Sequence, residues 1–134
     1  MEFYKKLRQT SQKKNVKFLY STNVGAGLPI ISTLRELVNS GDKIIKIEGI
    51  LSGTLSYLFN SFLGDTKFSQ IVKSAMENGY TEPDPRDDLN GLDVARKLLI
   101  MIREIGIDLE LKDIEVENLV PQKARNVKSI ESFF

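Results

Sequence analysis

The stretch GYTEPDPRDDLNGLDVARK, at residues 79–97, carries the strongest structural signals in this sequence. Its first half holds two prolines among acidic and amide side chains, which predicts a loop from Tyr80 to Asn90. Because Pro83 and Pro85 each fix φ, we expect that loop to be stiff. Its second half begins the clearest helical pattern in the chain, since apolar side chains recur at helical spacing over residues 91–105. The stretch therefore predicts a stiff polar loop leading into a helix.

Carboxylates crowd this loop and the start of the helix. Such crowding is costly unless cations, helix termini or ligand amines compensate for it. Composition alone favours a solvated acidic turn. A calcium loop is an alternative, but the spacing lacks the D-x-[DN]-x-[DN]-G pattern of an EF-hand. The carboxylates are Glu82, Asp84, Asp87, Asp88 and Asp93, and Arg86 is the only cation among them.

Asp93 and Lys97 are four residues apart, so the predicted helix places them on one face. An exposed ion pair of this kind contributes only a few tenths of a kcal/mol, roughly. The same face of the helix continues through the apolar residues Ile100 and Met101, however, so it is not solvent-exposed along its whole length. A lysine held beside a carboxylate at the mouth of a pocket has the chemistry to donate or accept a proton from a substrate. Both interpretations remain open on spacing alone.

Outside this stretch the pattern alternates helices with short strands. Helical spacing or capping residues predict helices near residues 2–14, 29–40, 54–63 and 69–78. Strands are predicted at 16–20, 43–51 and 114–120, where β-branched and aromatic residues gather. We therefore expect an α+β (α/β) fold in which helices pack on a small mixed β-sheet.

Composition excludes several classes of function. The chain has 134 residues, with a net charge of +1 and no long apolar run, so nothing favours nucleic acid, a lipid surface or a membrane span. It has no cysteine, which fits a reducing cytoplasm, and no histidine. Without either residue there is no Ser-His-Asp triad, no Cys-His pair and no ordinary zinc site. Any proton transfer must use Asp, Glu, Lys or Tyr.

A second candidate site is the glycine loop Gly25-Ala26-Gly27, which follows a predicted strand. The dinucleotide fingerprint G-x-G-x-x-G needs a third glycine where this chain has Ile30. Positive φ or close backbone approach explains the glycines better. We therefore interpret this loop as a structural turn whose carbonyls can face a monovalent cation.

Four stretches together resemble the homoserine dehydrogenases, whether monofunctional or fused to aspartate kinase. They are TNVGAGLPII at 22–31, the following NSGDKIIKIEG, GILSGTLSYLFN at 49–60 and residues 79–97. The resemblance covers residues 16–121. It implies interconversion of aspartate 4-semialdehyde and homoserine with NAD or NADP, on the route to threonine, isoleucine and methionine. Members of the family are usually dimers.

The resemblance also implies roles for individual residues. Lys97 and Asp93 match the pair at the reacting oxygen, and Glu82 matches the carboxylate that binds the substrate ammonium group. Asp88, Thr54 (through its backbone) and Tyr80 match other residues of the substrate pocket. Backbone carbonyls at the positions of Val24, Ala26 and Leu28 hold a sodium ion in some members. Ser21 stands where many members have an acid, which weakens the case for tight sodium binding.

Domain organisation follows from the same resemblance. Residues 1–20 match the end of a nucleotide-binding Rossmann domain, and residues 21–134 match a truncated substrate-binding and catalytic domain. We expect no cofactor-binding residue in this chain and no hydride transfer by it alone. The alternatives are a non-catalytic amino-acid-binding or dimerisation module of the same fold, and a metal-dependent enzyme that uses the acidic loop. The absence of histidine makes the metal-dependent enzyme the weakest of the three.

Overall fold

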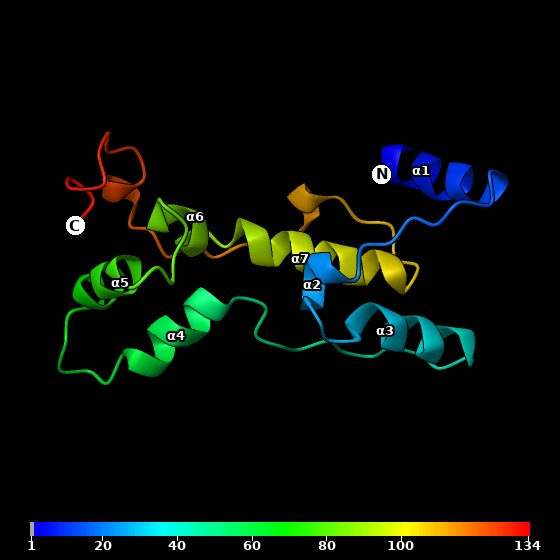
Figure 1. The fold of residues 1–134 in the computed structure, drawn as a ribbon, viewed down its shortest axis with the longest axis horizontal. Helices are drawn as coiled ribbons and strands as arrows, with labels where there is room; N and C mark the ends of the chain where they lie inside the picture. Colours follow the sequence, from blue (N-terminus) through cyan, green and yellow to red (C-terminus); the bar gives the residue numbers. More distant parts are fainter. Residues whose placement is uncertain (1) are drawn as a thin grey trace. The chain divides into compact units, whose positions relative to one another are not determined.

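A computed structural model describes residues 2–134, and Met1 lies outside the described residues. These residues fold into helices (Figure 1) and divide into two compact units. The first unit holds residues 1–48 and 96–114, and the second holds residues 49–95 and 115–134. The elements are α1 (Glu2–Lys13), α2 (Thr22–Gly25), α3 (Ile30–Asn39), α4 (Gly53–Ser61), α5 (Phe68–Glu77), α6 (Pro85–Leu89), α7 (Leu92–Glu104), and the 3-10 turns η1 (Leu111–Asp113) and η2 (Gln122–Ala124).

The predicted mixed sheet is not formed among residues 2–134. The segments 16–20, 43–51 and 114–120 are irregular chain, with no strand assigned in any of them. A strand needs a neighbour to satisfy its backbone groups, and the propensity of β-branched residues cannot supply one. Apolar side chains of the middle segment remain in solvent, since Ile45 is 93% and Ile50 75% exposed. The helical part of the fold is confirmed, and the sheet is not.

The first unit is built from α1, α2, α3 and the C-terminal part of α7. The short α2 packs against α3. The apolar stripe predicted for residues 29–40, from Ile30 to Val38, is confirmed in part, because Leu34 is buried while Leu37 and Val38 stay about one third exposed. The other buried side chain of α3 is Ile31, which the predicted stripe did not include. Other buried side chains of this unit are Tyr20, Val24, Leu99 and Met101.

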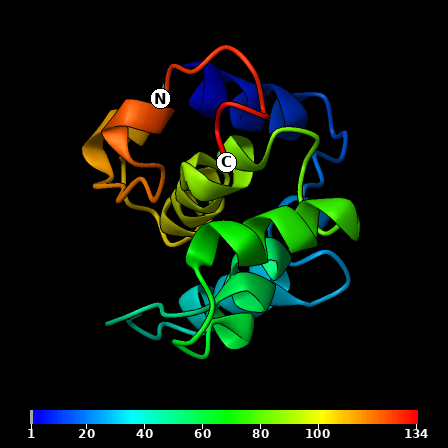
Figure 2. The same ribbon diagram turned by 90° about the vertical axis from the view of Figure 1, so that its left-hand side faces the viewer.

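In the second unit α4 packs against both α5 and α6 (Figure 2). The apolar stripe of α5 explains this packing, because its buried side chains recur at helical spacing. Leu58, at the centre, is fully buried. The core consists of Leu58, Ile71, Val72, Ala75, Leu89 and Val120, with Phe133 packed at its edge.

The predicted loop at residues 80–90 contains a short helix, α6. Asp84 is its N-cap and accepts a hydrogen bond from the backbone N–H of Arg86 at 3.0 Å. Pro85 follows at the first helical position, where proline needs no backbone donor. An Asp-Pro pair is therefore a helix start here, and the prediction of a continuous loop was wrong.

Ser52 caps α4, the helix that carries Thr54. Its hydroxyl oxygen accepts a hydrogen bond from the backbone N–H of Leu55 at 3.1 Å. We expect Ser52→Ala to lower the free energy of unfolding by about 1 kcal/mol, because that N–H loses its partner. Urea denaturation followed by circular dichroism measures the change. The control is Ser61→Ala at the other end of α4, and equal urea midpoints for the two variants would contradict the capping role.

Candidate functional site

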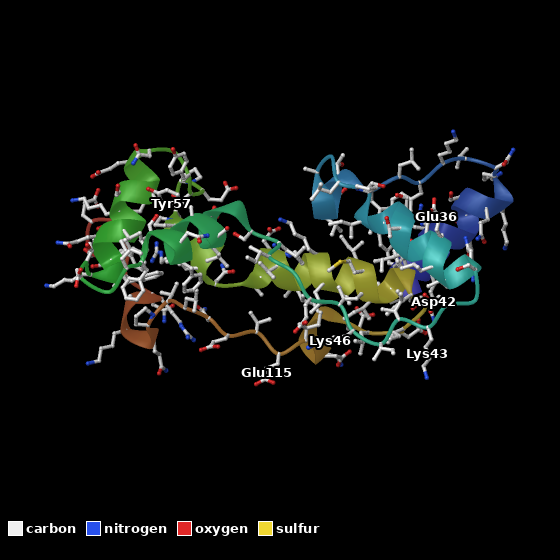
Figure 3. All side chains as sticks on the ribbon, turned by 90° about the horizontal axis from the view of Figure 1, so that it is seen from below. Glu36, Asp42, Lys43, Lys46, Tyr57 and Glu115 are labelled. Carbon is white, nitrogen blue, oxygen red and sulfur yellow. The ribbon has the colours of Figure 1, made fainter. Side chains whose placement is uncertain are left out.

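Thr54 and Tyr80 lie together in the second unit. The Thr54 hydroxyl donates a hydrogen bond to the backbone carbonyl of Tyr80 at 2.8 Å. The Tyr80 ring meets the Tyr57 ring edge to face, with centroids 4.7 Å apart (Figure 3 labels Tyr57). Tyr80 nevertheless remains 53% exposed. A hydrogen bond therefore connects the start of α4 to the residue that precedes the acidic loop. The Tyr80 side chain is half exposed to solvent at this point.

Glu82 and Asp88 also lie together. A carboxylate oxygen of Asp88, in α6, accepts a hydrogen bond from the backbone N–H of Glu82 at 2.8 Å. The hydroxyl of Thr81 donates to the Glu82 carbonyl at 2.8 Å. The backbone of Glu82 is therefore held on both sides, while the residue itself is exposed. This arrangement leaves the Glu82 carboxylate facing solvent on a fixed backbone.

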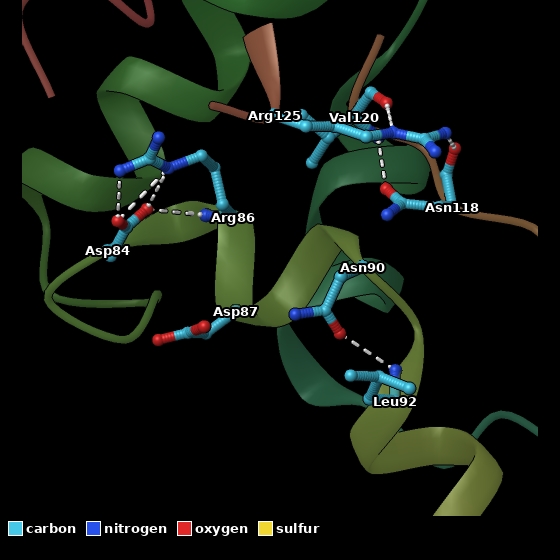
Figure 4. A pocket seen from close by; sticks show the side chains of 8 residues that line it. All are labelled: Asp84, Arg86, Asp87, Asn90, Leu92, Asn118, Val120 and Arg125. Atoms are coloured by element: carbon cyan, nitrogen blue, oxygen red, sulfur yellow. Dashed lines mark hydrogen bonds and ion pairs between the residues drawn. The ribbon is translucent and has the colours of Figure 1, made fainter. Parts of the chain in front are cut away.

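Asp84 and Arg86 pair with each other (Figure 4). The guanidinium donates to the Asp84 carboxylate from Nε at 2.9 Å and from Nη2 at 2.6 Å, and its Nη1 donates to the Val127 carbonyl at 2.8 Å. The hydrogen bonds from Arg86 hold the pKa of Asp84 below its usual range. Arg86, the one cation inside the acidic stretch, is therefore paired with Asp84 and also binds the chain at Val127. Sequence spacing did not assign this pair.

Two cavities lie among the described residues of the second unit, and none of the predicted site residues lines either of these two. One, of about 420 Å³, lies beside the Asp84–Arg86 pair and is bordered by Asn90 and Arg125 (Figure 4). The other, of about 410 Å³, lies between residues 49–52 and α4 and is more apolar. Thr54 and Tyr80 form one hydrogen-bonded pair outside these two cavities, and Glu82 and Asp88 form another.

Asp93 and Lys97 are both carried by α7. Asp93 lies in the first turn of the helix, and Lys97 follows one turn later on the same face. The start of α7 depends on Gly91, which has φ +76° and no room for a side chain: a Cβ there would lie 2.8 Å from Val116. Asp93 is exposed, and Lys97 is half-buried. The two residues belong to the second and the first unit respectively.

The glycine loop is a structural turn, as predicted, but for a more specific reason. A Cβ on Gly25 would lie 2.8 Å from the Ile30 side chain, so close approach explains this glycine. Gly27 has open space around it and no positive φ. The residue with positive φ is Ala26, at +50°. The Leu28 carbonyl accepts a hydrogen bond from the Ile30 N–H at 2.9 Å.

Sequence reasoning missed a buried cluster in the first unit, centred on Glu104 at the end of α7. The Glu104 side chain is only 1% exposed. Its Oε2 accepts from Arg35 Nε at 2.5 Å, and its Oε1 accepts from the Tyr20 hydroxyl and faces Arg8 Nη1 at 3.5 Å. Glutamate and arginine at these positions looked like ordinary surface residues, and no spacing links residues so far apart in sequence.

The pKa values in this cluster follow from burial and pairing. Burial favours the neutral carboxyl of Glu104, but hydrogen bonds from Arg35 and Tyr20 outweigh it and hold its pKa below the usual range. Burial, with the neighbouring carboxylate, raises the pKa of Tyr20 well above its ordinary value. At neutral pH the carboxylate is therefore charged and the phenol is protonated.

The described residues also bear on the metal-dependent alternative. Within residues 2–134, no group of three or more acidic side chains is arranged to hold a metal ion. The metal-dependent enzyme therefore gains no support from the acidic loop. No helix in this part of the chain has the length and apolarity to cross a bilayer.

Comparison with known proteins identifies the class and then the family. A model of the homoserine dehydrogenase family matches residues 29–133. The class is that of oxidoreductases of amino-acid biosynthesis on the aspartate pathway, which generally use NAD or NADP. The chain belongs to the homoserine dehydrogenase family.

Individual relatives agree with this assignment. The bifunctional aspartokinase/homoserine dehydrogenase 2 of Arabidopsis thaliana chloroplasts is 54% identical over 133 residues, which is 99% of this chain and 14% of that protein. The homoserine dehydrogenase of Schizosaccharomyces pombe is 49% identical over 138 residues, which is 98% of this chain and 37% of that protein. A crystal structure of a Candida auris protein of unknown function matches with TM-score 0.81 and 50% identity, over 85% of this chain and 33% of that one. This chain thus spans between 14% and 37% of these relatives.

Proposed function

We propose that this chain supplies the substrate-binding part of a homoserine dehydrogenase, which interconverts L-aspartate 4-semialdehyde and L-homoserine. The observation that carries the proposal is the family match over residues 29–133. Two hydrogen-bonded pairs, Thr54 with Tyr80 and Glu82 with Asp88, support it, because those residues match the family's substrate pocket.

The roles proposed for the side chains follow from the charges of the substrate. Homoserine carries an ammonium group, which needs a carboxylate such as Glu82. Asp88 positions Glu82 through its backbone N–H. Hydride arrival at the aldehyde carbon builds an alkoxide, which needs a nearby cation and a proton source, and Lys97 supplies both. Asp93, one helical turn before Lys97, orients its ammonium group.

The family resemblance implies two bound groups, a nicotinamide cofactor and a sodium ion, and this chain differs in what it offers to each. NAD or NADP supplies the hydride, and we propose that residues outside this chain hold it, because the loop at Gly25 lacks the dinucleotide fingerprint and is filled by Ile30. For sodium, carbonyls at Val24, Ala26 and Leu28 are hard oxygen donors of a suitable kind. The Leu28 carbonyl already accepts a backbone hydrogen bond from Ile30.

We further propose that the segments 16–20, 43–51 and 114–120 are strands of a mixed sheet completed by protein outside this chain. The exposure of Ile45 and Ile50 supports this, because apolar side chains on an unpaired segment gain stability when a neighbour covers them. A homodimer, a cytoplasmic location and the boundary near residue 20 belong to the same proposal. Several plant relatives are chloroplast proteins by name.

The activity is tested by a chimera. This chain replaces the matching segment of the S. pombe homoserine dehydrogenase, and NADPH oxidation is followed with aspartate 4-semialdehyde. We expect turnover within about tenfold of the parent enzyme, a barrier difference of about 1.4 kcal/mol. A folded chimera that binds NADPH and homoserine without turnover would instead support the non-catalytic binding module.

A further inference from the structure

Glu104 has an unusual position for a charged side chain. It is the last residue of α7, where the negative end of the helix dipole disfavours a carboxylate. It is also almost fully buried, at 1% exposure. Both features oppose an ionised glutamate, so its partners must compensate. The positions of these partners therefore indicate the role of Glu104.

Those partners flank a longer loop, residues 21–29, which contains α2 and the glycine loop. Tyr20 immediately precedes the loop and donates its hydroxyl to Glu104. Arg35 lies on α3, which follows the loop, and donates to Glu104 at 2.5 Å and to the Tyr20 hydroxyl at 3.1 Å. Arg8 of α1 donates to the same hydroxyl at 2.8 Å. One carboxylate therefore joins α7 to both ends of the loop that holds Val24, Ala26 and Leu28.

Glu104 also shares a face of α7 with Lys97. The two are seven residues apart, just under two turns of helix and roughly 10.5 Å along its axis. An anchor at Glu104 fixes the rotation of α7 about that axis. It thereby fixes the direction in which Lys97 leaves the helix.

We propose that Glu104 is a positioning residue, which sets the direction of Lys97 and the shape of the glycine loop through its bonds to Tyr20 and Arg35. The catalytic meaning of this placement rests on the proposed function. Glu104 touches neither substrate nor cofactor and acts through Lys97.

The test is NMR on the 134-residue chain with ¹³C-labelled lysine and ¹⁵N-labelled backbone. The variants are Glu104→Gln, which keeps the shape but removes the charge, and Glu104→Asp, which keeps the charge. The matched control is Glu36→Gln on α3, next to Arg35, where the glutamate is exposed (Figure 3). The measured signals are the Lys97 side-chain resonance and the amides of residues 24–28.

We expect Glu104→Gln to shift the loop amides and the Lys97 side-chain resonance beyond the changes in the control. Glu104→Asp should shift them less, and amides of the second-unit core should not change in either variant. If Glu104→Gln unfolds, the Glu104→Asp comparison with the control decides the question. Lys97 and loop signals that match the control in a folded variant would overturn the proposal. Failure of L-homoserine to bind the unsubstituted chain would count against the proposed function alone.

Discussion

Replacing Lys97 by alanine should lower turnover of aspartate 4-semialdehyde in the S. pombe chimera by a factor of about 10²–10⁴, with a smaller effect on KM. The alkoxide formed by hydride transfer would lose both its cation and its proton source. Steady-state rates of NADPH oxidation give the comparison. Lys97→Arg should not restore the rate, because a guanidinium keeps its proton throughout the working pH range.

The control for Lys97 is Arg96→Ala at the preceding, exposed position of α7. It removes a positive charge of the same sign from a neighbouring face of the helix. We expect it to leave turnover nearly unchanged. Equal losses in the two variants would show that the net charge of the helix matters, and that Lys97 is not the proton donor.

Replacing Arg35 by leucine should destabilise the first unit by about 3 kcal/mol, because the buried Glu104 carboxylate loses its closest cation. Glu104→Gln should cost less, about 1–2 kcal/mol. The arginines it leaves behind are 35% and 39% exposed, so water can hydrate them. Urea denaturation measures both, with Glu36→Ala as the control. A larger loss for Glu104→Gln than for Arg35→Leu would contradict this account of the cluster.

The stability from Glu104 should depend on pH. Its pKa in the folded protein lies below its unfolded value, so the folded state favours the charged form. The contribution is therefore complete above the unfolded pKa of about 4.3 and is lost as pH falls through the lower, folded pKa. We expect the difference between the unsubstituted chain and Glu104→Gln to shrink below about pH 4. A difference that is constant down to low pH would contradict the ionised carboxylate.

Local sequence signals predicted the helices well. The apolar spacing over residues 91–105 predicted α7, and the apolar run that begins at Leu55 predicted α4, which starts two residues earlier, at Gly53. The same rules did not predict α6. The two prolines were interpreted as a loop signal, although Asp84 followed by Pro85 is also a helix start. The sheet failed for a different reason: β propensity describes a surface that fits a sheet, and pairing depends on neighbours that residues 2–134 do not provide for one another.

Sequence likewise identified some of the residues discussed above and missed others. Family resemblance selected Thr54, Tyr80, Glu82 and Asp88, and the structure places them in two hydrogen-bonded pairs, although their roles stay predictions. The Glu104 cluster could not be found from sequence. It depends on contacts between residues far apart in the sequence, such as Arg8 and Glu104, which are 96 positions apart, and no local pattern records such a contact.

The most direct test of the central claim is a titration of the 134-residue chain with L-homoserine, followed by NMR. We expect chemical shifts to change around Thr54, Tyr80 and Glu82. We also expect Glu82→Gln to weaken homoserine binding by about tenfold to a hundredfold, because the substrate ammonium loses its charged partner. Glu77→Gln, an exposed glutamate at the end of α5, should bind as the unsubstituted chain does. A well-folded spectrum that homoserine leaves unchanged, or a Glu82→Gln variant that binds normally, would contradict that claim.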